Sequence, residues 1–250
     1  MDGAYSLFVN DAASYTIKFS TQPSTVPVYF APNKNIEVSE SKDLGITTVY
    51  EGLNILNRIS NSDGSQYEYS DTAHVSFVDL DGQVLSEQDI YYDSYYSYPV
   101  YNFNIVKSGK GIIKHDMPDS YLDFIFDFTE QGTGTQKIVK NTKVYKVSES
   151  STIKGSISPA KEGVQVSFRL SDGSEYVTTT KADGSYDLLV PPGQEGTFIV
   201  KDPELGTFYE KFNSGSTGEI KYKDKNMNEK YLVTVDLGNG HISPAGVPEG

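Results

Sequence analysis

Tyrosine side chains are concentrated in one short stretch near the middle of the chain. Six of the 11 residues from position 91 to position 101 are tyrosine: Tyr91, Tyr92, Tyr95, Tyr96, Tyr98 and Tyr101. Tyrosine is a rigid, amphipathic contact residue that is favoured in surfaces that bind proteins and sugars. It also has a high β-propensity, so an ordinary strand is the alternative. The stretch predicts a binding platform for a glycan or a protein.

Pairs of aspartates are the next candidates, because carboxylate oxygens are the ligands that Ca²⁺ prefers. The pairs are Asp79 with Asp81, Asp116 with Asp119, and Asp123 with Asp127. The Asp79-Leu80-Asp81-Gly82 segment lacks EF-hand spacing, and a tight hairpin turn explains its Asp-Gly. His74, His115 and His241 lie far apart and show no zinc spacing. We therefore expect no metal and no other cofactor.

Catalytic motifs are missing from the sequence. It contains no Gly-x-Ser-x-Gly, no phosphate-binding loop and no cysteine nucleophile. Aspartate and glutamate are abundant, but nothing in their spacing singles out the carboxylate pair that a glycosidase needs. The sequence therefore predicts a protein that is not an enzyme.

Composition limits the partners and the compartment. The 250 residues suffice for two domains of about 100–150 residues each. The net charge of −13 disfavours nucleic acid, which needs concentrated lysine and arginine. The absence of cysteine excludes disulfides, and no apolar run is long enough for a membrane span. The Met1-Asp2-Gly3 beginning and the Val247–Gly250 ending lead us to expect a piece of a longer, exported protein.

The elements that would position these residues are strands, and the C-terminal half displays them most clearly. Apolar residues alternate with polar ones at Val164, Val166, Phe168 and Leu170. Such alternation is typical of a strand with one buried face. Asp172-Gly173 and Asp183-Gly184 then lie between β-rich runs, as in tight hairpins. This order predicts a small antiparallel β-sandwich over residues 149–236.

Four segments of this half resemble the prealbumin-like group, which includes carboxypeptidase regulatory-like domains and the B-type repeats of bacterial collagen adhesins. They are Lys154-Gly155-Ser156-Ile157, Gly163-Val164-Gln165-Val166, Thr180 to Tyr186, and Pro192-Gly193. The resemblance implies a β-sandwich that serves as a spacer or an adhesive module. Gln194-Glu195-Gly196 departs from the family by lengthening the turn after Pro-Gly.

The same resemblance implies a spontaneous isopeptide crosslink, which collagen-adhesin domains often carry. It points to Lys154 as the nucleophile and to Asn226, Asn228 or Asp236 as the acceptor. The family's acidic residue after the Pro-Gly strand is missing, since Lys201-Asp202-Pro203 stands there. In the N-terminal half, outside the resemblance, Lys18, Asn141 and Asp123 or Asp127 are a geometric possibility for such a crosslink. Ordinary solvated strand residues are the alternative in both halves.

The N-terminal half, residues 1–148, is predicted to be a β-rich domain with one short helix. Its alternating runs are Tyr15–Ser20, Val26–Phe30, Ile36–Ser41, Tyr121–Glu130 and Lys137–Val147. In the fourth run, Leu122, Phe124, Phe126 and Phe128 are predicted to face a core. The helix is predicted over Leu44–Ile59, where Val49, Leu53, Leu56 and Ile59 have helical spacing. Gly52 weakens this helix.

A second resemblance lies in the segment from Phe77 to Gln88. Its Val-Asp-x-Asp-Gly order is similar to the Listeria–Bacteroides repeat of Gram-positive surface proteins, which is related to mucin-binding repeats and implies a small β-grasp fold. Tyr231–Gly240 resembles the first strand of another such repeat or the closing strand of the preceding domain, and we favour the closing strand. Residues 237–250 are then a tail or the start of a further repeat.

Taken together, the sequence predicts a mostly all-β chain of two tandem modules. We expect a non-catalytic adhesive or stalk segment at the cell-wall surface of a Gram-positive bacterium, with a host glycan or extracellular protein as partner. Accessory modules of a large secreted glycoside hydrolase or peptidase are one alternative. A mechanical spacer without a ligand is the other.

Overall fold

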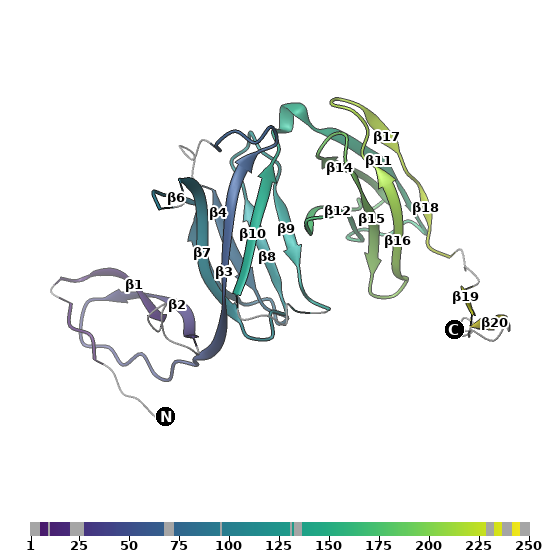
Figure 1. Cartoon of the computed structure of the whole chain (residues 1–250). Helices are drawn as coiled ribbons and strands as arrows, with labels where there is room; N and C mark the ends of the chain where they lie inside the picture. The colour runs from purple at the N-terminus through teal and green to yellow at the C-terminus, as the bar shows by residue number, and fades with distance from the viewer. Residues whose placement is uncertain are drawn as a thin grey trace. The chain divides into compact units, whose positions relative to one another are not determined.

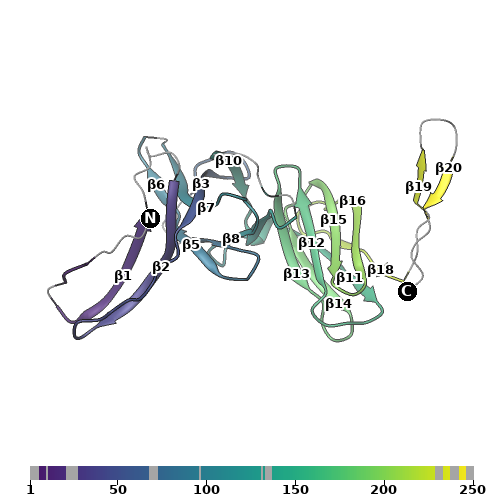
Figure 2. The same ribbon diagram turned by 90° about the horizontal axis from the view of Figure 1, so that it is seen from below.

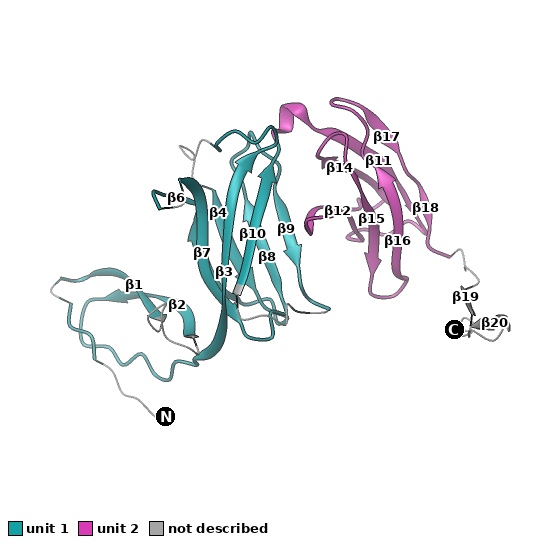
Figure 3. Cartoon of the chain, viewed as in Figure 1, with its two compact units in different colours: residues 1–145 teal, residues 146–250 magenta. Residues whose placement is uncertain are grey.

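The computed structural model describes residues 6–9, 11–20, 28–67, 73–95, 97–130, 132, 137–228, 233–236 and 242–245. The chain divides into two compact units, Met1–Tyr145 (unit 1) and Lys146–Gly250 (unit 2; Figure 3). In the described residues the one helical element is the short 3-10 turn η1, Val147–Glu149. The predicted all-β class is therefore confirmed.

The described residues of unit 1 form ten strands. These strands lie in two sheets (Figure 1). They are β1 (Ala13–Ser20), β2 (Val28–Val38), β3 (Tyr50–Asn61), β4 (His74–Val78), β5 (Val84–Asp89), β6 (Tyr91–Asp93), β7 (Tyr98–Val106), β8 (Ile112–Asp116), β9 (Phe124–Asp127) and β10 (Lys137–Val144). One sheet has the order β1-β2-β3-β7-β6, with β10 parallel to β3. The other has the order β9-β8-β4-β5 and is antiparallel. The two sheets enclose the core of a sandwich.

Strands β1 and β2 form a long hairpin that extends away from the rest of unit 1 (Figures 1 and 2). Only three residue pairs, from Val28–Gly52 to Phe30–Tyr50, join β2 to β3. Gly52 is needed at this junction, because a Cβ there would lie 2.8 Å from the ring of Phe30 and 3.1 Å from the carbonyl oxygen of Ile105.

The predicted helix over Leu44–Ile59 is wrong, because the strand β3 occupies most of this segment. The core-facing residues of β3 alternate as a strand requires, namely Leu53, Ile55, Asn57 and Ile59, and all four are buried. Asn57 is polar, which hides the period of two in the sequence. Leu56 is buried on the opposite face, and this second buried face produces the misleading helical spacing.

Unit 2 is a sandwich of two sheets, followed by a separate hairpin (Figures 1 and 2). Its strands are β11 (Ser151–Ser158), β12 (Gln165–Leu170), β13 (Ser174–Thr179), β14 (Ser185–Val190), β15 (Glu195–Asp202), β16 (Gly206–Asn213), β17 (Ile220–Tyr222), β18 (Lys225–Asn226), β19 (Val233–Asp236) and β20 (Ile242–Ala245). One sheet has β11 at its centre, with β14 on one side and with β17 and β18 parallel to it. The other has the order β16-β15-β12-β13.

One of the two predicted hairpins of unit 2 is confirmed, because Asp172-Gly173 joins the paired strands β12 and β13. Asp183-Gly184 also forms a tight turn, but it leads from one sheet to the other, since β13 pairs with β12 and β14 pairs with β11. Asp172 and Asp183 each accept two hydrogen bonds from the serine two residues ahead, at 2.9 Å from the backbone nitrogen and 2.6 Å from the hydroxyl. This carboxylate arrangement stabilises the turn that joins the two strands. The alternating residues predicted for the core are all buried: Val164, Val166, Phe168 and Leu170.

Two further sequence expectations have mixed outcomes. The strand that we favoured as the close of the sandwich, β19, pairs with β20 instead, and β17 and β18 take the closing position. The hairpin predicted over Phe77–Gln88 is present as β4 and β5. These strands belong to a sandwich sheet, and membership of the Listeria–Bacteroides repeat is not confirmed. Residues 237–241 and 246–250 of the predicted tail lie outside the described part of the chain.

Candidate functional site at the β6–β7 hairpin

The hairpin between β6 and β7 presents most of the clustered tyrosines. Its turn is closed by Asp93, whose carbonyl oxygen accepts a 2.8 Å hydrogen bond from the Ser97 nitrogen. The Asp93 carboxylate also accepts a 2.8 Å bond from the backbone nitrogen of Tyr95. Ser97 has a φ of 56°, a left-handed conformation that is uncommon outside glycine. These contacts hold Tyr95 at the tip, where its side chain is 87% exposed.

The strand register distributes the remaining exposed tyrosines over two faces. Tyr91 pairs with Val100 and Tyr98 pairs with Asp93, so Tyr91 and Tyr98 share one face of the hairpin. Tyr92 pairs with Pro99 and lies on the other face. Tyr91 and Tyr92 are 38% exposed and Tyr98 is 42% exposed, so all three are reachable from solvent. Tyr96 lies outside the described residues.

Tyr101 does not belong to this exposed group, because it is completely buried in the core of unit 1. Its hydroxyl lies 2.9 Å from His115 Nε2 and accepts a 3.2 Å hydrogen bond from the side-chain amide of Asn57. Its ring packs on Phe103 at a centroid distance of 5.3 Å. The sequence could not separate Tyr101 from its neighbours, since all of them have the same chemistry and only the register decides which side chain points inward.

A chain of buried polar groups therefore crosses the core of unit 1. Asn57 of β3 contacts the hydroxyl of Thr142 of β10, with distances of 3.0 Å from Nδ2 and 3.1 Å from Oδ1. Tyr101 of β7 links Asn57 to His115 of β8, and His115 Nδ1 lies 3.2 Å from the carbonyl oxygen of Phe124. The carbonyl can only accept, so Nδ1 carries the proton and Nε2 accepts from the Tyr101 hydroxyl.

Burial keeps these polar groups of the unit 1 core uncharged. It lowers the pKa of His115 to about 3 and raises the pKa of Tyr101 above its ordinary value. The His115 ring also stacks on Phe124 at a centroid distance of 3.9 Å. Both ring nitrogens are engaged within the core, so neither offers a base to a substrate. The polar groups link the two sheets of unit 1, and both ring nitrogens of His115 have a hydrogen-bond partner.

The residues implied in an isopeptide crosslink make other contacts in this structure. Lys154 Nζ lies 2.9 Å from Asp187 Oδ1, and both side chains are more than 40% exposed. Hydrogen bonding to Asp187 raises the pKa of Lys154, whereas a nucleophilic amine must lose its proton. Asn226 pairs with Ser158, four positions along β11 from Lys154, or about 13 Å. Asn228 lies beyond it, and the side chain of Asp236 is outside the described part.

The corresponding set in unit 1 is also divided. Lys18 belongs to β1, which pairs with β2, whereas Asn141 of β10 pairs with Arg58 of β3. Asp127 accepts hydrogen bonds from the nitrogen and hydroxyl of Thr129, as a turn residue does. Asp123 accepts a 2.7 Å bond from the Met117 nitrogen, and its pKa is raised chiefly by burial.

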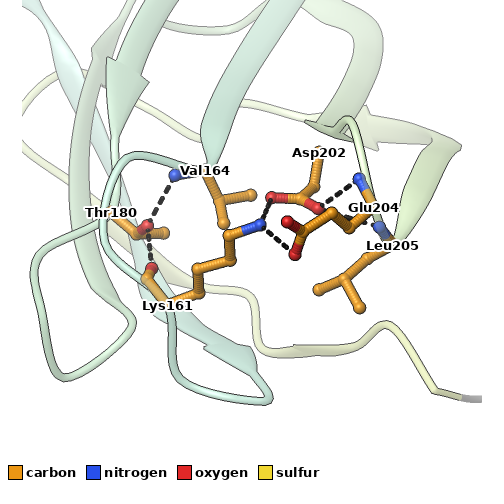
Figure 4. A network of polar contacts seen from close by, with 6 residues as sticks. All are labelled: Lys161, Val164, Thr180, Asp202, Glu204 and Leu205. Carbon is orange, nitrogen blue, oxygen red and sulfur yellow. Dashed lines mark hydrogen bonds and ion pairs between the residues drawn. The ribbon is translucent and has the colours of Figure 1, made fainter.

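A polar network around Lys161 in unit 2 was not predicted from the sequence (Figure 4). Lys161 Nζ lies 2.8 Å from both Asp202 Oδ2 and Glu204 Oε2. The Asp202 carboxylate also accepts 2.8 Å bonds from the backbone nitrogens of Glu204 and Leu205. Thr180 joins the Lys161 loop to β12 by donating to the Lys161 carbonyl and accepting from the Val164 nitrogen.

Hydrogen bonding within this network raises the pKa of Lys161 and lowers the pKa of Asp202. Both shifts favour the charged forms. The pair is therefore an ion pair that fastens the loop after β11 to the turn between β15 and β16. Amide formation would need the opposite shifts, because it requires a neutral amine and a protonated acid.

Metal ligands are not gathered anywhere in the described ranges, where no group of three or more His, Cys, Asp or Glu residues could hold an ion. The Asp79 carboxylate is occupied by its turn, since it accepts from the backbone nitrogens of Asp81 and Gln83 at 3.0 and 2.9 Å. Over the same ranges, no helix has the length and apolar character that crossing a membrane would need.

Comparison with known proteins assigns no family, since no family model and no curated protein matches the chain. Among solved structures, the TIE protein of Bacillus anthracis is 11% identical, with a TM-score of 0.29, over 86% of this chain and 48% of that one. A D295N mutant of the shaft pilin SpaA from Lactobacillus rhamnosus GG is 9% identical, with a TM-score of 0.27, over 69% and 98%. The fimbrial anchor protein Mfa2 from Porphyromonas gingivalis is 12% identical, with a TM-score of 0.27, over 64% and 82%. This chain thus spans about half the length of the TIE protein, and likeness at this level assigns it no function.

Proposed function

We propose that this chain is a non-catalytic, extracellular adhesive or stalk segment of a Gram-positive bacterial cell-surface protein. Its β6–β7 hairpin binds a host glycan or an extracellular protein. The observation that carries the proposal is the exposure of four tyrosines on one short hairpin, with Tyr95 at the tip 87% exposed. Aromatic side chains that are held in place and accessible are the usual anchors of a recognition surface.

The turn geometry supports this assignment. Asp93 accepts hydrogen bonds from the backbone nitrogens of Tyr95 and Ser97, which favours a preformed backbone at Tyr95. Pre-ordering reduces the entropy that is lost on binding. The two-faced arrangement of Tyr91 and Tyr92 favours a ligand that grips the hairpin from both sides over one that lies on a flat platform.

The proposal that the chain is not an enzyme rests on the state of its titratable groups. His115 and Tyr101 are neutral and bonded to each other inside the core. Lys161 and Asp202 are locked in an ion pair. None of these four groups has the free, partly ionised state that a general acid or base needs near neutral pH.

The test is binding of the full chain to an array of host glycans and extracellular proteins, with and without Ca²⁺. The variant carries Tyr91, Tyr92, Tyr95 and Tyr98 replaced by serine. The matched control is Tyr209→Ser in β16, which removes an exposed tyrosine (49%) from unit 2. We expect the hairpin variant to lose about tenfold or more in affinity, as for contact hot spots, and the control to bind normally. If the native chain bound nothing on the array, or if both variants lost the same affinity, the proposal would be contradicted.

A further inference from the structure

Each unit is closed by a strand that runs parallel to its first core strand. In unit 2, β17 and β18 both pair in parallel with β11, from Thr152–Ile220 to Ser158–Asn226. In unit 1, β10 pairs in parallel with β3 over eight residue pairs, from Asn54–Lys137 to Asn61–Val144. Parallel pairing of the first and last core strands has a mechanical consequence.

Parallel pairing changes how the strands bear tension that is applied along the protein chain. In a parallel pair, the entry end of the first strand and the exit end of the last strand lie at opposite ends of the ladder. Tension then acts along the strands and across the hydrogen bonds, so that all the rungs bear load together. In an antiparallel pair of terminal strands the two ends lie side by side, and the rungs open one after another.

We propose that β11 with β17 and β18, and β3 with β10, are shear clamps that make each unit resist tension between its ends. The inference goes beyond the binding function, because it does not depend on the β6–β7 hairpin having a ligand. A chain that transmits force between two attachment points is the kind of protein that such clamps suit.

The clamp of unit 2 is continuous even where β17 and β18 are interrupted. Its backbone bonds outside the regular pairs join Gly218 N to Ser150 O (2.9 Å), Thr152 N to Glu219 O (2.9 Å), Lys223 N to Lys154 O (2.8 Å) and Met227 N to Ser158 O (2.8 Å). Between the two strands, Asp224 Oδ1 accepts from the nitrogen and hydroxyl of Ser156 at 2.8 and 2.9 Å. A carboxylate thus supplies the rung that the backbone lacks.

Gly155 permits this close pairing. A Cβ at position 155 would lie 1.9 Å from the carbonyl oxygen of Lys223 and 2.9 Å from the hydroxyl of Tyr186. That hydroxyl donates to the same carbonyl oxygen. Any side chain at position 155 must therefore push the closing segment away from β11.

The β1–β2 hairpin has the opposite geometry. Ala13, where tension enters, pairs with Val38, from which the chain continues toward β3. Tension therefore opens this hairpin one pair at a time, starting at Ala13–Val38. The hairpin should yield at low force, while the clamps of both units still hold.

The experiment uses single-molecule pulling of the full chain at defined points, which is direct because the chain contains no cysteine. The Glu149→Cys, Asn228→Cys protein loads the unit 2 clamp in shear. The Ala160→Cys, Asn228→Cys protein pulls on the same strands from one end, so that they separate rung by rung. All three positions are exposed, so neither protein should lose stability.

We expect a several-fold higher rupture force in the shear geometry. In that geometry, rupture should release about 270 Å of chain, at about 3.5 Å for each residue from 151 to 228. Equal rupture forces in the two geometries would overturn the proposal.

A pair of glycine variants tests which contacts form the clamp. Gly155→Ala disturbs the closing segment, whereas Gly196→Ala in β15 places a Cβ 2.6 Å from the Phe168 ring and 2.7 Å from the Arg169 carbonyl, outside the clamp. For each variant, the drop in shear rupture force is divided by its drop in unfolding free energy. We expect this ratio to be larger for Gly155→Ala than for Gly196→Ala. Equal relative losses would contradict the assignment, and Asp224→Ala replaces Gly155→Ala if that variant does not fold.

Discussion

The two units share a closing geometry but differ in the chemistry of their cores. In unit 1 a chain of polar groups from Asn57 to His115 crosses between the sheets. In unit 2 the centre is apolar, with Ile153, Phe168 and Phe198 completely buried. The polar groups from Asn57 to His115 bond to one another and to the Phe124 carbonyl oxygen, which offsets the cost of burying them. Parallel closure therefore does not require one kind of core, and we expect the two cores to respond differently to mutation and to pH.

The largest expected effect is the removal of a core ring from unit 2. Phe198 is completely buried, between Tyr186 and Phe212. Phe198→Ala should lower the unfolding free energy of unit 2 by about 3–5 kcal/mol, since it removes buried apolar area and leaves a cavity. Calorimetry should show that one transition moves and the other does not, which assigns each transition to its unit. A uniform shift of both transitions would contradict the division into two units.

The next effect is a difference between the two units in how their stability depends on pH. His115 has a folded pKa of about 3 and an ordinary value of 6.5, so the unfolded chain binds a proton that the folded core excludes. The stability contribution of neutral His115 is complete above pH 6.5 and is lost progressively as pH falls toward 3. Unit 1 should therefore lose about 2 kcal/mol between pH 7 and pH 5, from a slope of about 1.4 kcal/mol per pH unit below 6.5.

Unit 2 provides the internal control for this pH effect. It has no histidine between Lys146 and Asn228. Its paired carboxylates, Asp183, Asp187, Asp202 and Glu219, have lowered pKa values, so their contribution is present above their ordinary values near 4 and is lost only in stronger acid. If the unit 2 transition moved as much as that of unit 1 between pH 7 and pH 5, the account of His115 would be wrong.

A smaller effect is expected from breaking the polar chain at its middle. Tyr101→Phe keeps the ring but leaves His115 Nε2 without its donor and removes one of the two acceptors of the Asn57 amide, the other being Thr142. The cost should be about 1–3 kcal/mol in denaturant unfolding of unit 1, because a buried polar group is left unmatched. Tyr95→Phe at the exposed tip is the control and should change stability by less than about 0.5 kcal/mol.

The smallest effect concerns the ion pair around Lys161. Asp202→Ala removes the acceptor for Lys161, Glu204 and Leu205, so it should lower the melting temperature of unit 2. Asp202→Asn keeps an oxygen for the backbone nitrogens and should lower it less. Glu204→Gln, in a side chain that is 80% exposed, should have the least effect. The reverse order in thermal melts would show that the charge of Glu204, not the turn, fixes this loop.

Local signals made unit 2 easier to predict than unit 1. The Asp-Gly-Ser segments at Asp172 and Asp183 specify tight turns within a few residues, and the apolar alternation from Val164 to Leu170 marks the buried face. Leu122, Phe124 and Phe126 of unit 1 are buried as predicted, although Phe128 is only half-buried. In β3 the same kind of alternation is broken by Asn57, whose partner Thr142 lies 85 residues away. A polar residue on a core face can be understood only once that distant partner is known.

The candidate site shows the same limit. The tyrosine cluster is visible in the sequence, but the burial of Tyr101 and the separation of Tyr91 from Tyr92 follow from strand register. The implied crosslink at Lys154 stays a prediction, and the register brings Asp187 beside Lys154 and Asn226 opposite Ser158. Parallel closure by β10 or β18 leaves no local signal at all.

If the closing segment of unit 2 is an integral part of its fold, native-state hydrogen exchange should detect this at two backbone amides. The amides of Lys223 and Met227, which bond to Lys154 and Ser158, should exchange only when the whole of unit 2 unfolds. The free energy of opening measured at these two amides should then equal the value measured at the backbone amide of Phe198 in the apolar core. Exchange of both amides at a much lower free energy, by local fraying, would contradict closure by this segment and the clamp built on it.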